Sequence, residues 1–316
     1  MIGEASTLSS EAGSAPLFVG LGELIWDLLP TGRELGGAPS NFAHFARLLG
    51  ARGAVATRVG DDALGREARA RLASAGVSTE HIQVDREHPT GTVGVEVGPG
   101  GEPRFRVNEN SAWDYLELTP ELGRLAALAD AVCFGTLGQR SPQARASILG
   151  FLGLTRAGAL RVFDANLRHS FFSPEMLRRS LELADVVKLN REELAAAAGM
   201  LGLRARGEAE LCRGLAAEFG LRLVAVTRGA SGCLLAAGAE AVEHPGYDVR
   251  VVDTIGCGDA FAATLTRCLL AGAPLDAAAA AANRAGAWVA ARRGATPPPE
   301  PSTAAEILGG TQILFR

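Results

Sequence analysis

Residues 253–261, late in the chain, combine glycines and carboxylates in a pattern suited to holding a phosphate. They read Asp-Thr-Ile-Gly-Cys-Gly-Asp-Ala-Phe, and the apolar residues that follow recur every four positions, which predicts one face of a helix. Gly256 and Gly258, with Cys257 between them, let the backbone turn tightly and expose N–H groups. A helix N-terminus adds unpaired amides and the positive end of a dipole. The stretch is therefore predicted to bind an anion such as a phosphate.

The carboxylate of Asp259 stands near the end of this stretch. A negative charge beside an anion site repels the ligand unless it accepts a proton from the group that attacks the phosphate. Asp259 is therefore a candidate general base for phosphoryl transfer. The alternative from the residues alone is that Asp259 only caps the helix. The run at 247–252 predicts a strand that leads into the loop.

A second glycine loop lies near the start of the chain. The apolar run at 17–23 predicts a buried parallel strand, and residues 36–41 then read Gly-Gly-Ala-Pro-Ser-Asn before a helical pattern. Asn41 carries both an amide donor and a carbonyl acceptor, which suits a ligand with several hydroxyls. The alternative is that Ser40 or Asn41 caps the helix.

Polar side chains also follow two predicted strands in the middle of the chain. Residues 164–168 read Asp-Ala-Asn-Leu-Arg, and the forked cation of Arg168 could hold a phosphate or bridge sugar oxygens. Lys188 ends the next strand among apolar neighbours, where an anionic ligand would compensate its charge or the side chain would extend to solvent. Asn190 and Glu193 then stand at capping-box spacing. Ligands gather beyond the carboxyl ends of strands in such sheets, so these residues are candidates for a site.

A hairpin interrupts this βα alternation. Apolar residues alternate at 92–97 and 104–107, on either side of a Gly/Pro turn at 99–103. A small sheet cannot bury itself alone, so we expect it to act as a lid over the site. The polar residues at 108–114 would either reach the ligand or form a turn, and the turn is favoured.

Composition limits the functions that remain. The 316 residues carry a formal net charge of −4, which gives no support for binding nucleic acid or an anionic membrane, and no apolar run reaches membrane-spanning length. Five scattered cysteines without Cys-x-x-Cys spacing argue against a zinc site or disulfides and favour the cytoplasm. Residues 1–16 lack the basic region of a targeting signal and are predicted to be a disordered tail.

Several of these motifs resemble those of one family. Residues 253–259 resemble the Asp-Thr-x-Gly-Ala-Gly-Asp signature of the ribokinase-like (PfkB) carbohydrate kinases, with Cys257 in place of alanine. Residues 36–41 resemble the fructokinase version of the family's N-terminal signature. The family's Asp-x-Asn-x-Arg, Asn-x-x-Glu and Thr-x-Gly-x-x-Gly elements are similar to segments that begin at Asp164, Asn190 and Thr227.

The resemblance implies a role for each matching residue. Asp259 would be the catalytic base, and the amides of Gly256, Cys257 and Gly258 would hold the transferring phosphoryl group. The implied substrate residues are Asp27, Gly36, Gly37, Asn41, Asn166 and Arg168. The implied nucleotide residues are Lys188, Asn190, Thr227, Gly229, Gly232 and Asn283, although periodicity does not decide which way Asn283 faces.

Cofactors follow from the same resemblance. ATP would be the phosphoryl donor with Mg²⁺, which Glu193 would reach through water because magnesium retains several water ligands. Asp253 is a candidate ligand for a monovalent cation such as K⁺. Whether the Cys257 thiol has a role beyond packing stays open.

These observations predict an α/β protein, a ribokinase-like three-layer sandwich with a central, mostly parallel sheet and a small β-sheet lid. The kinase domain would span 17–305, with the lid inserted around 91–110 and a C-terminal segment at 306–316. The expected activity is ATP-dependent phosphorylation of a hydroxyl of a small sugar, with fructose as the expected substrate.

Other functions remain open at this stage. A nucleoside kinase of the same fold and a non-catalytic sugar-binding regulator are the alternatives. A Rossmann dehydrogenase is disfavoured because Gly20 and Gly22 lack a third glycine at the required spacing. An exposed lid edge could also pair two subunits into a homodimer.

Overall fold

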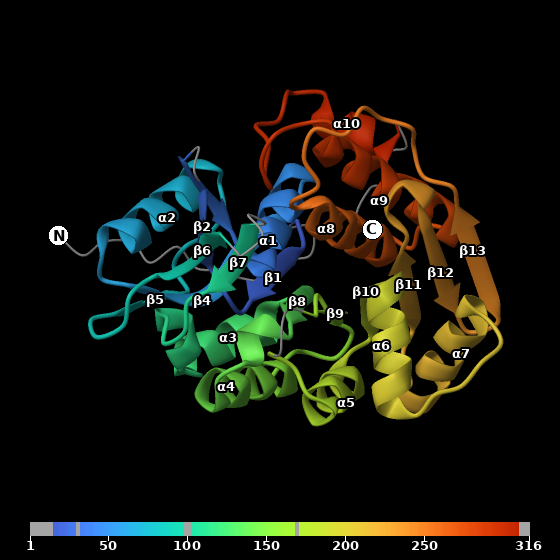
Figure 1. Ribbon diagram of the computed structural model, residues 1–316, viewed down its shortest axis with the longest axis horizontal. Helices are drawn as coiled ribbons and strands as arrows, with labels where there is room; N and C mark the ends of the chain where they lie inside the picture. Colours follow the sequence, from blue (N-terminus) through green and yellow to red (C-terminus); the bar gives the residue numbers. More distant parts are fainter. Residues whose placement is uncertain (1–14, 30–31, 98–102, 168–170, 310–316) are drawn as a thin grey trace.

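A large twisted sheet forms the centre of the protein (Figure 1). The computed structural model describes residues 15–29, 32–97, 103–167 and 171–309. In these residues the sheet has nine strands in the order β13-β12-β11-β10-β9-β8-β1-β4-β5, and all neighbours from β5 to β11 pair in parallel. The strands are β1 (Leu17–Leu21), β4 (Arg52–Gly60), β5 (Ile82–Asp85), β8 (Ala131–Gly135), β9 (Leu160–Asp164), β10 (Val186–Asn190), β11 (Leu223–Thr227), β12 (Cys233–Ala237) and β13 (Glu240–His244).

Helices cover both faces of this sheet, which makes three layers (Figure 1). One core cluster joins the sheet to α1 (Ala38–Leu48), α8 (Cys257–Leu270), α9 (Leu275–Ala290) and α10 (Thr303–Leu308). The cluster on the other face includes α3 (Pro120–Leu128), α4 (Pro142–Gly153), α5 (Pro174–Leu183), α6 (Arg191–Leu201) and α7 (Glu208–Phe219). Because both faces are covered, central strands such as β1 are buried along their whole length. The predicted sandwich is confirmed.

A separate four-stranded sheet, which we call the small sheet, lies beside the first strands. Its order is β3-β2-β6-β7, formed by β2 (Ile25–Leu29), β3 (Gly32–Gly36), β6 (Gly91–Val97) and β7 (Pro103–Val107). Strands β6 and β7 confirm the predicted hairpin, and most of its turn, at 98–102, lies outside the described residues. Strands β2 and β3 were not predicted, because β3 reads Gly-Arg-Glu-Leu-Gly and offers no apolar alternation.

The small sheet is tied to the main body through Asp62. This residue caps α2 (Ala63–Ser74) by accepting a hydrogen bond from the Gly65 amide. Its carboxylate also accepts from the Thr90 amide (2.8 Å) and hydroxyl (2.7 Å), one residue before β6 begins. Burial disfavours the anion, but these hydrogen bonds lower the pKa of Asp62. The carboxylate therefore joins α2 to the base of the small sheet.

Residues 108–111 form a turn, in agreement with the favoured interpretation, and it leads into a short 3₁₀ helix (Ala112–Tyr115). Arg140 holds this turn with hydrogen bonds to both carboxylate oxygens of Asp114 (2.8 and 2.7 Å) and to the Asn108 carbonyl (2.6 Å). Such a two-pronged arginine contact fixes geometry as well as charge. Two other 3₁₀ turns span Leu137–Gln139 and Gly229–Ser231.

The prediction of a strand at 247–252 is wrong. This segment runs in extended form outside both sheets, and the side chains of Val251 and Val252 are 58% and 50% exposed. Its last residue instead donates a backbone hydrogen bond to Ala290 of α9 (2.7 Å). Alternation reports an extended chain with two different sides, and it does not show whether a neighbouring strand is present.

The described ranges contain no helix that combines the length and apolar character required to cross a membrane.

Candidate functional site

The N-terminus of α8 is built as the sequence predicts. Gly256 is its N-cap with φ of 81°, and a Cβ atom there would lie 2.3 Å from the Ala295 carbonyl oxygen. Only glycine fits such a left-handed, crowded position. A Cβ on Gly258 would lie 3.0 Å from Nζ of Lys188, so the backbone passes close to a cation. First-turn amides and an ammonium thus meet at one point.

Asp259 lies in the first turn of α8 and faces residues 36–41, at the start of α1, which we call the sugar-side loop. Its Oδ2 atom accepts a hydrogen bond of 2.7 Å from Nδ2 of Asn41, a buried residue of α1 that is 218 positions away in the chain. The candidate base and the candidate sugar residue are therefore in direct contact. Capping alone does not require such a partner from another helix.

The N-cap alternative for Ser40 and Asn41 is wrong. The N-cap of α1 is Gly37, and both polar residues lie inside the helix. The Ser40 hydroxyl donates back to the carbonyls of Gly36 (3.0 Å) and Gly37 (2.9 Å). Gly37 has φ of 104°, and a Cβ atom there would lie 2.7 Å from the Glu23 carbonyl oxygen. The loop therefore depends on glycine at this position.

Asp27 reaches the same loop from the small sheet. It lies on β2, and its Oδ2 atom is 3.0 Å from the position that a Cβ on Gly36 would occupy. The structure therefore brings Asp27 and Gly36 together on one side of the loop. Asn41, which contacts Asp259, follows Gly37 in the chain, whereas Gly36 precedes it.

Lys188 is buried and paired rather than extended into solvent. Its Nζ atom donates to both carboxylate oxygens of Asp164, at 2.8 and 3.0 Å, and the residue is 7% exposed. Burial alone disfavours the ammonium, but Asp164, Glu193 and Asp259 outweigh it and raise the pKa of Lys188. The side chain is therefore a fixed positive charge beneath the start of α8.

Glu193 forms the predicted capping box with Asn190 at the start of α6. The Asn190 side chain accepts from the Glu193 amide and the Glu193 Oε2 atom accepts from the Asn190 amide, both at 2.8 Å. The second oxygen, Oε1, accepts from the Leu167 amide at 2.9 Å. Glu193 therefore fastens the loop after β9 to α6.

The loop after β9 holds Asn166 in an uncommon conformation. Its φ is 38°, in the left-handed region that non-glycine residues rarely adopt. The Thr136 hydroxyl supports the loop by donating to the carbonyls of Ala165 (2.9 Å) and Asn166 (3.4 Å). Arg168, the last residue of this motif, lies outside the described residues.

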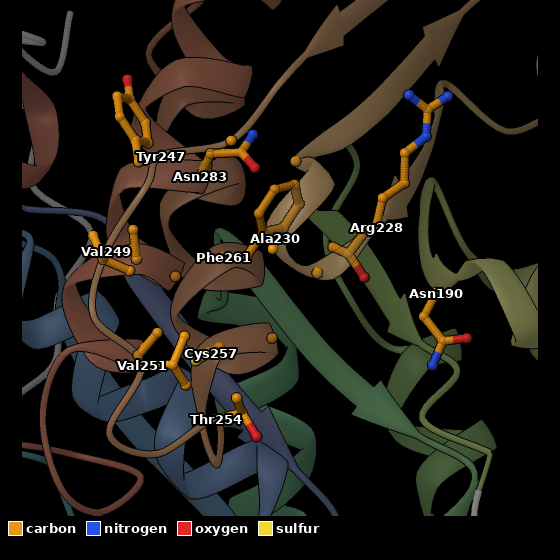
Figure 2. Close-up of a pocket in the computed structure, with 18 of the residues that line it drawn as sticks. Asn190, Arg228, Ala230, Tyr247, Val249, Val251, Thr254, Cys257, Phe261 and Asn283 are labelled. Atoms are coloured by element: carbon orange, nitrogen blue, oxygen red, sulfur yellow. The ribbon is translucent and has the colours of Figure 1, made fainter.

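A pocket of about 880 Å³ opens on the other side of the α8 N-terminus (Figure 2). Its lining comes from the start of α6, the β11–β12 turn, the 245–254 segment, α8 and α9. Five predicted nucleotide residues line it, namely Asn190, Thr227, Gly229, Gly232 and Asn283, and Lys188 does not. The main apolar lining was missed by sequence reasoning: Tyr247, Val249, Val251, Phe261, Ala287 and Ala290.

Two positions of this pocket are fixed by close packing. Gly232 has φ of 79°, and a Cβ atom there would lie 1.8 Å from the His244 carbonyl oxygen. Asn283 is buried on α9, and its Nδ2 atom donates to the Ala279 carbonyl (2.7 Å) and to the Cys233 sulfur (3.0 Å). Because the amide nitrogen is used in this way, the side-chain oxygen is the group left for a ligand.

Cys257 lines the same pocket from the first turn of α8. Burial, with Asp253 and Asp259, raises its pKa to about 11, so the thiol is neutral near pH 7.

The Asp253 carboxylate accepts from the amides of Ile255 and Gly294, each at 3.0 Å. It therefore ties the loop before α8 to the segment after α9. In the described part of the chain, no three His, Cys, Asp or Glu side chains gather to hold a metal ion.

The fold and the site together define a class of enzyme. A nucleotide-sized pocket ends at a helix N-terminus, and a loop with a buried amide and a carboxylate meets the same helix from the other side. This is the arrangement of a kinase that moves a phosphoryl group from a nucleotide to a small acceptor.

Comparison with known proteins gives the family. Residues 30–302 match the model of the pfkB family of carbohydrate kinases, and the chain belongs to this family. It is an ATP-dependent sugar kinase, as the sequence motifs predicted.

Several of the relatives, in sequence and in structure, are named fructokinases. The chain is 33% identical over 271 residues to fructokinase of Escherichia coli, covering 80% of this chain and 83% of the relative. It is 31% identical to fructokinase-1 of Oryza sativa subsp. japonica, covering 90% and 95%. The crystal structure of Vibrio cholerae O395 fructokinase with fructose, ADP and calcium superposes with a TM-score of 0.78 at 27% identity, covering 93% of this chain and 99% of that one.

Proposed function

We propose that this sugar kinase transfers the γ-phosphoryl group of ATP to a hydroxyl of fructose. The hydrogen bond between Asn41 and Asp259 (2.7 Å) carries the proposal, because it brings the sugar-side loop to a carboxylate at the mouth of the nucleotide pocket. The choice of fructose is supported by several relatives that are named fructokinases and by the fructose bound to the Vibrio cholerae enzyme.

Asp259 acts as the general base in this proposal. Its carboxylate accepts the proton of the sugar hydroxyl as the hydroxyl oxygen attacks the γ-phosphorus, and Asn41 fixes the carboxylate in place. The amides of Gly256, Cys257 and Gly258 hold the transferring group at the helix N-terminus. Lys188 lies beside Gly258 and adds a fixed positive charge. Arg168, outside the described residues, would supply a second cation.

The sugar lies between the small sheet and α1 in this scheme. Asp27 and Gly36 approach each other at one end of the loop, and Gly37 and Asn41 continue it toward the base. Asn166 borders the same region from the loop after β9. Hydroxyls of a small sugar need donors and acceptors on several sides, and carboxylate, amide and backbone groups supply both kinds.

The nucleotide occupies the 880 Å³ pocket. Tyr247, Val249 and Phe261 provide an apolar wall for a base, and Figure 2 places Asn283 beside Tyr247. The free Asn283 oxygen is an acceptor, so it suits the amino group of adenine and disfavours the carbonyl of guanine. The glycine turn after Thr227 also lines the pocket and packs against Gly246, the residue before Tyr247.

The cation sites are also part of the proposal. Mg²⁺ would be held mainly by phosphate oxygens and water, with Glu193 reaching it through water because each of its oxygens already accepts a backbone amide. When bound, it neutralises the phosphate charge. Asp253 is the proposed ligand of a monovalent cation such as K⁺. The chain is further proposed to act in the cytoplasm, on a small-molecule sugar, as a homodimer paired through the small sheet.

A substrate panel tests this function. Purified protein with ATP and Mg²⁺ is expected to phosphorylate fructose faster than glucose, ribose, adenosine or inosine, as measured by ADP release and by mass spectrometry of the product. Phosphorylation of nucleosides without sugars would contradict the proposal in favour of a nucleoside kinase. Sugar binding by calorimetry without any turnover would favour a non-catalytic regulator.

A further inference from the structure

Glu23 is a buried acid in the site to which the scheme above gives no task. It lies in the link between β1 and β2 and is 3% exposed. Its Oε2 atom is buried and has no hydrogen-bond partner in the described part of the chain. Surrounding backbone is packed closely against it, since a Cβ on Gly138 would lie 3.3 Å from that oxygen. A buried carboxyl oxygen without a partner is costly and calls for an explanation.

A small cavity of about 10 Å³ borders Glu23, which is room for about one water molecule. Its polar side chains are Glu23, Thr136, Asp164 and Asn166. Ala38 and Pro39, at the start of α1, also line this cavity. Glu23 thus lies under the sugar-side loop and the loop after β9 at once.

The charges around Glu23 come from several elements. The charges of Asp259 on α8 and Asp164 on β9 act on Glu23. Lys188 on β10 is paired with Asp164, and the Cys133 thiol on β8 is affected by Glu23 and by these same groups. Burial raises the pKa of Cys133 well above its usual range, so the thiol carries no charge. Asp164 and Lys188 neutralise each other as a pair. If Glu23 were ionised, it would add a further negative charge near Asp259, next to the phosphates of the nucleotide.

The protonated form of Glu23 avoids this repulsion. Burial raises the pKa of Glu23 from its ordinary 4.5 to about 7, the charges of Asp259 and Asp164 add to this, and the amides of Glu23 and Ala38 oppose it. A protonated carboxyl also supplies an O–H donor to the cavity, where Asp164 offers acceptor oxygens.

We propose that Glu23 is a positioning residue that holds a proton in the working enzyme, and that losing this proton at alkaline pH disables phosphoryl transfer. The inference rests on the proposed role of Asp259 as the base. Neutral Glu23 adds no second negative charge near Asp259 and supports the two loops around the sugar. Binding of the anionic nucleotide favours the protonated form, so nucleotide binding takes up a proton above pH 7.

Kinetics over pH 6 to 9 test this role with Glu23→Gln, which imitates the protonated acid. The wild type is expected to lose kcat/KM for the sugar about tenfold per pH unit above an apparent pKa at or above about 7. Glu23→Gln should keep wild-type activity at pH 6 within about threefold and lack this alkaline decline. A decline that persists unchanged in Glu23→Gln, or a folded Glu23→Gln without activity at pH 6, would overturn the proposal.

Proton uptake gives a readout that does not depend on turnover. Binding of ADP with Mg²⁺ is measured by calorimetry at pH 8 in buffers of different ionisation enthalpy. The control variant is Glu175→Gln, which changes an exposed residue of α5. The wild type and this control should take up a fraction of a proton on binding, and Glu23→Gln should not. Equal uptake in all three proteins contradicts the inference.

These two experiments separate the inference from the proposed function. A protein that phosphorylates no sugar would contradict the proposed function, while the calorimetric comparison would still decide on Glu23. If Glu23→Gln fails to fold, the infrared absorption of protonated carboxyls in the wild type decides. Loss of one such absorption between pH 6 and pH 9 supports the proposal, and no loss contradicts it.

Discussion

At the scale of single residues, Asp259 is the proposed base for phosphoryl transfer. Replacing it with asparagine keeps the size of the side chain and the contact with Asn41 but removes the proton acceptor. Asp259→Asn is expected to lower kcat by about 10²- to 10⁴-fold while changing sugar and nucleotide affinity little. Steady-state kinetics with calorimetric binding checks this. Turnover equal to the wild type would remove Asp259 from the role of base.

The buried acid Glu23 also has a consequence for stability. Its pKa is about 7 in the folded protein and near 4.5 when exposed, so its stabilising contribution is complete below pH 4.5 and is lost as pH rises through 7. The full difference is about 3 kcal/mol, and Glu23→Gln does not carry it. Urea unfolding should therefore show that Glu23→Gln gains stability relative to the wild type between pH 5 and pH 8.5. A constant difference across this range would mean that Glu23 ionises normally.

Cys257 stands where the family signature has alanine, and we expect its thiol to be unreactive near neutral pH. With a pKa of about 11, little of the thiol is reactive thiolate at pH 7.5. Cys257→Ala is expected to change kcat/KM by less than about threefold, since the backbone amide is kept. Wild-type Cys257 should be alkylated by iodoacetamide more slowly than a free thiol in a peptide, as followed by mass spectrometry. Rapid alkylation would contradict this assignment.

At the scale of elements, the start of α8 depends on a glycine that no other residue can replace. Gly256→Ala places a Cβ against the Ala295 carbonyl at a positive φ, and we expect a loss of stability of about 2 kcal/mol or more, with lower activity. Gly238→Ala is the matched control, because φ there is 57° and a Cβ would meet nothing within 4 Å. Thermal unfolding should show the larger loss for Gly256→Ala. Equal losses would mean that the conformation matters and the crowding does not.

The elements differ in how well the sequence predicts them. Parallel strands such as β1 are continuous apolar runs, so they were predicted. Strand β3 is polar and exposed on most of its length, and only pairing with β2 makes it a strand. The apolar residues Val249 and Val251 gave a false strand signal because they line the 880 Å³ pocket and not a sheet. Local patterns report burial, but they do not identify what covers the residue.

The same limit applies to the site. Glycine motifs identified the two loops and Asp259, since those residue types follow from backbone geometry and charge. The contact between Asn41 and Asp259 spans 218 positions and depends on how α1 packs on α8. The importance of Glu23 follows only from its burial among charges of four elements. A single acidic residue after a strand carries no such signal in the sequence.

At the scale of the whole molecule, the small sheet and α1 are linked through very little chain. Strand β3 ends at Gly36, α1 begins at Ala38, and Gly37 is the single residue between them. Because this link is so short, we expect a movement of the small sheet to shift α1 and the Asn41 amide that touches Asp259.

This short link bears on how the enzyme treats ATP when its sugar is scarce. A sugar that draws the small sheet over the site would, through Gly37, also bring the base into its working position. Without sugar, nothing would draw the small sheet over the site, so water would have to attack the phosphate in an uncovered site. We therefore expect ATP hydrolysis without sugar to be at least about 10²-fold slower than sugar phosphorylation, measurable as ADP release. The enzyme would then avoid hydrolysing ATP without sugar because a single glycine, Gly37, joins β3 to α1.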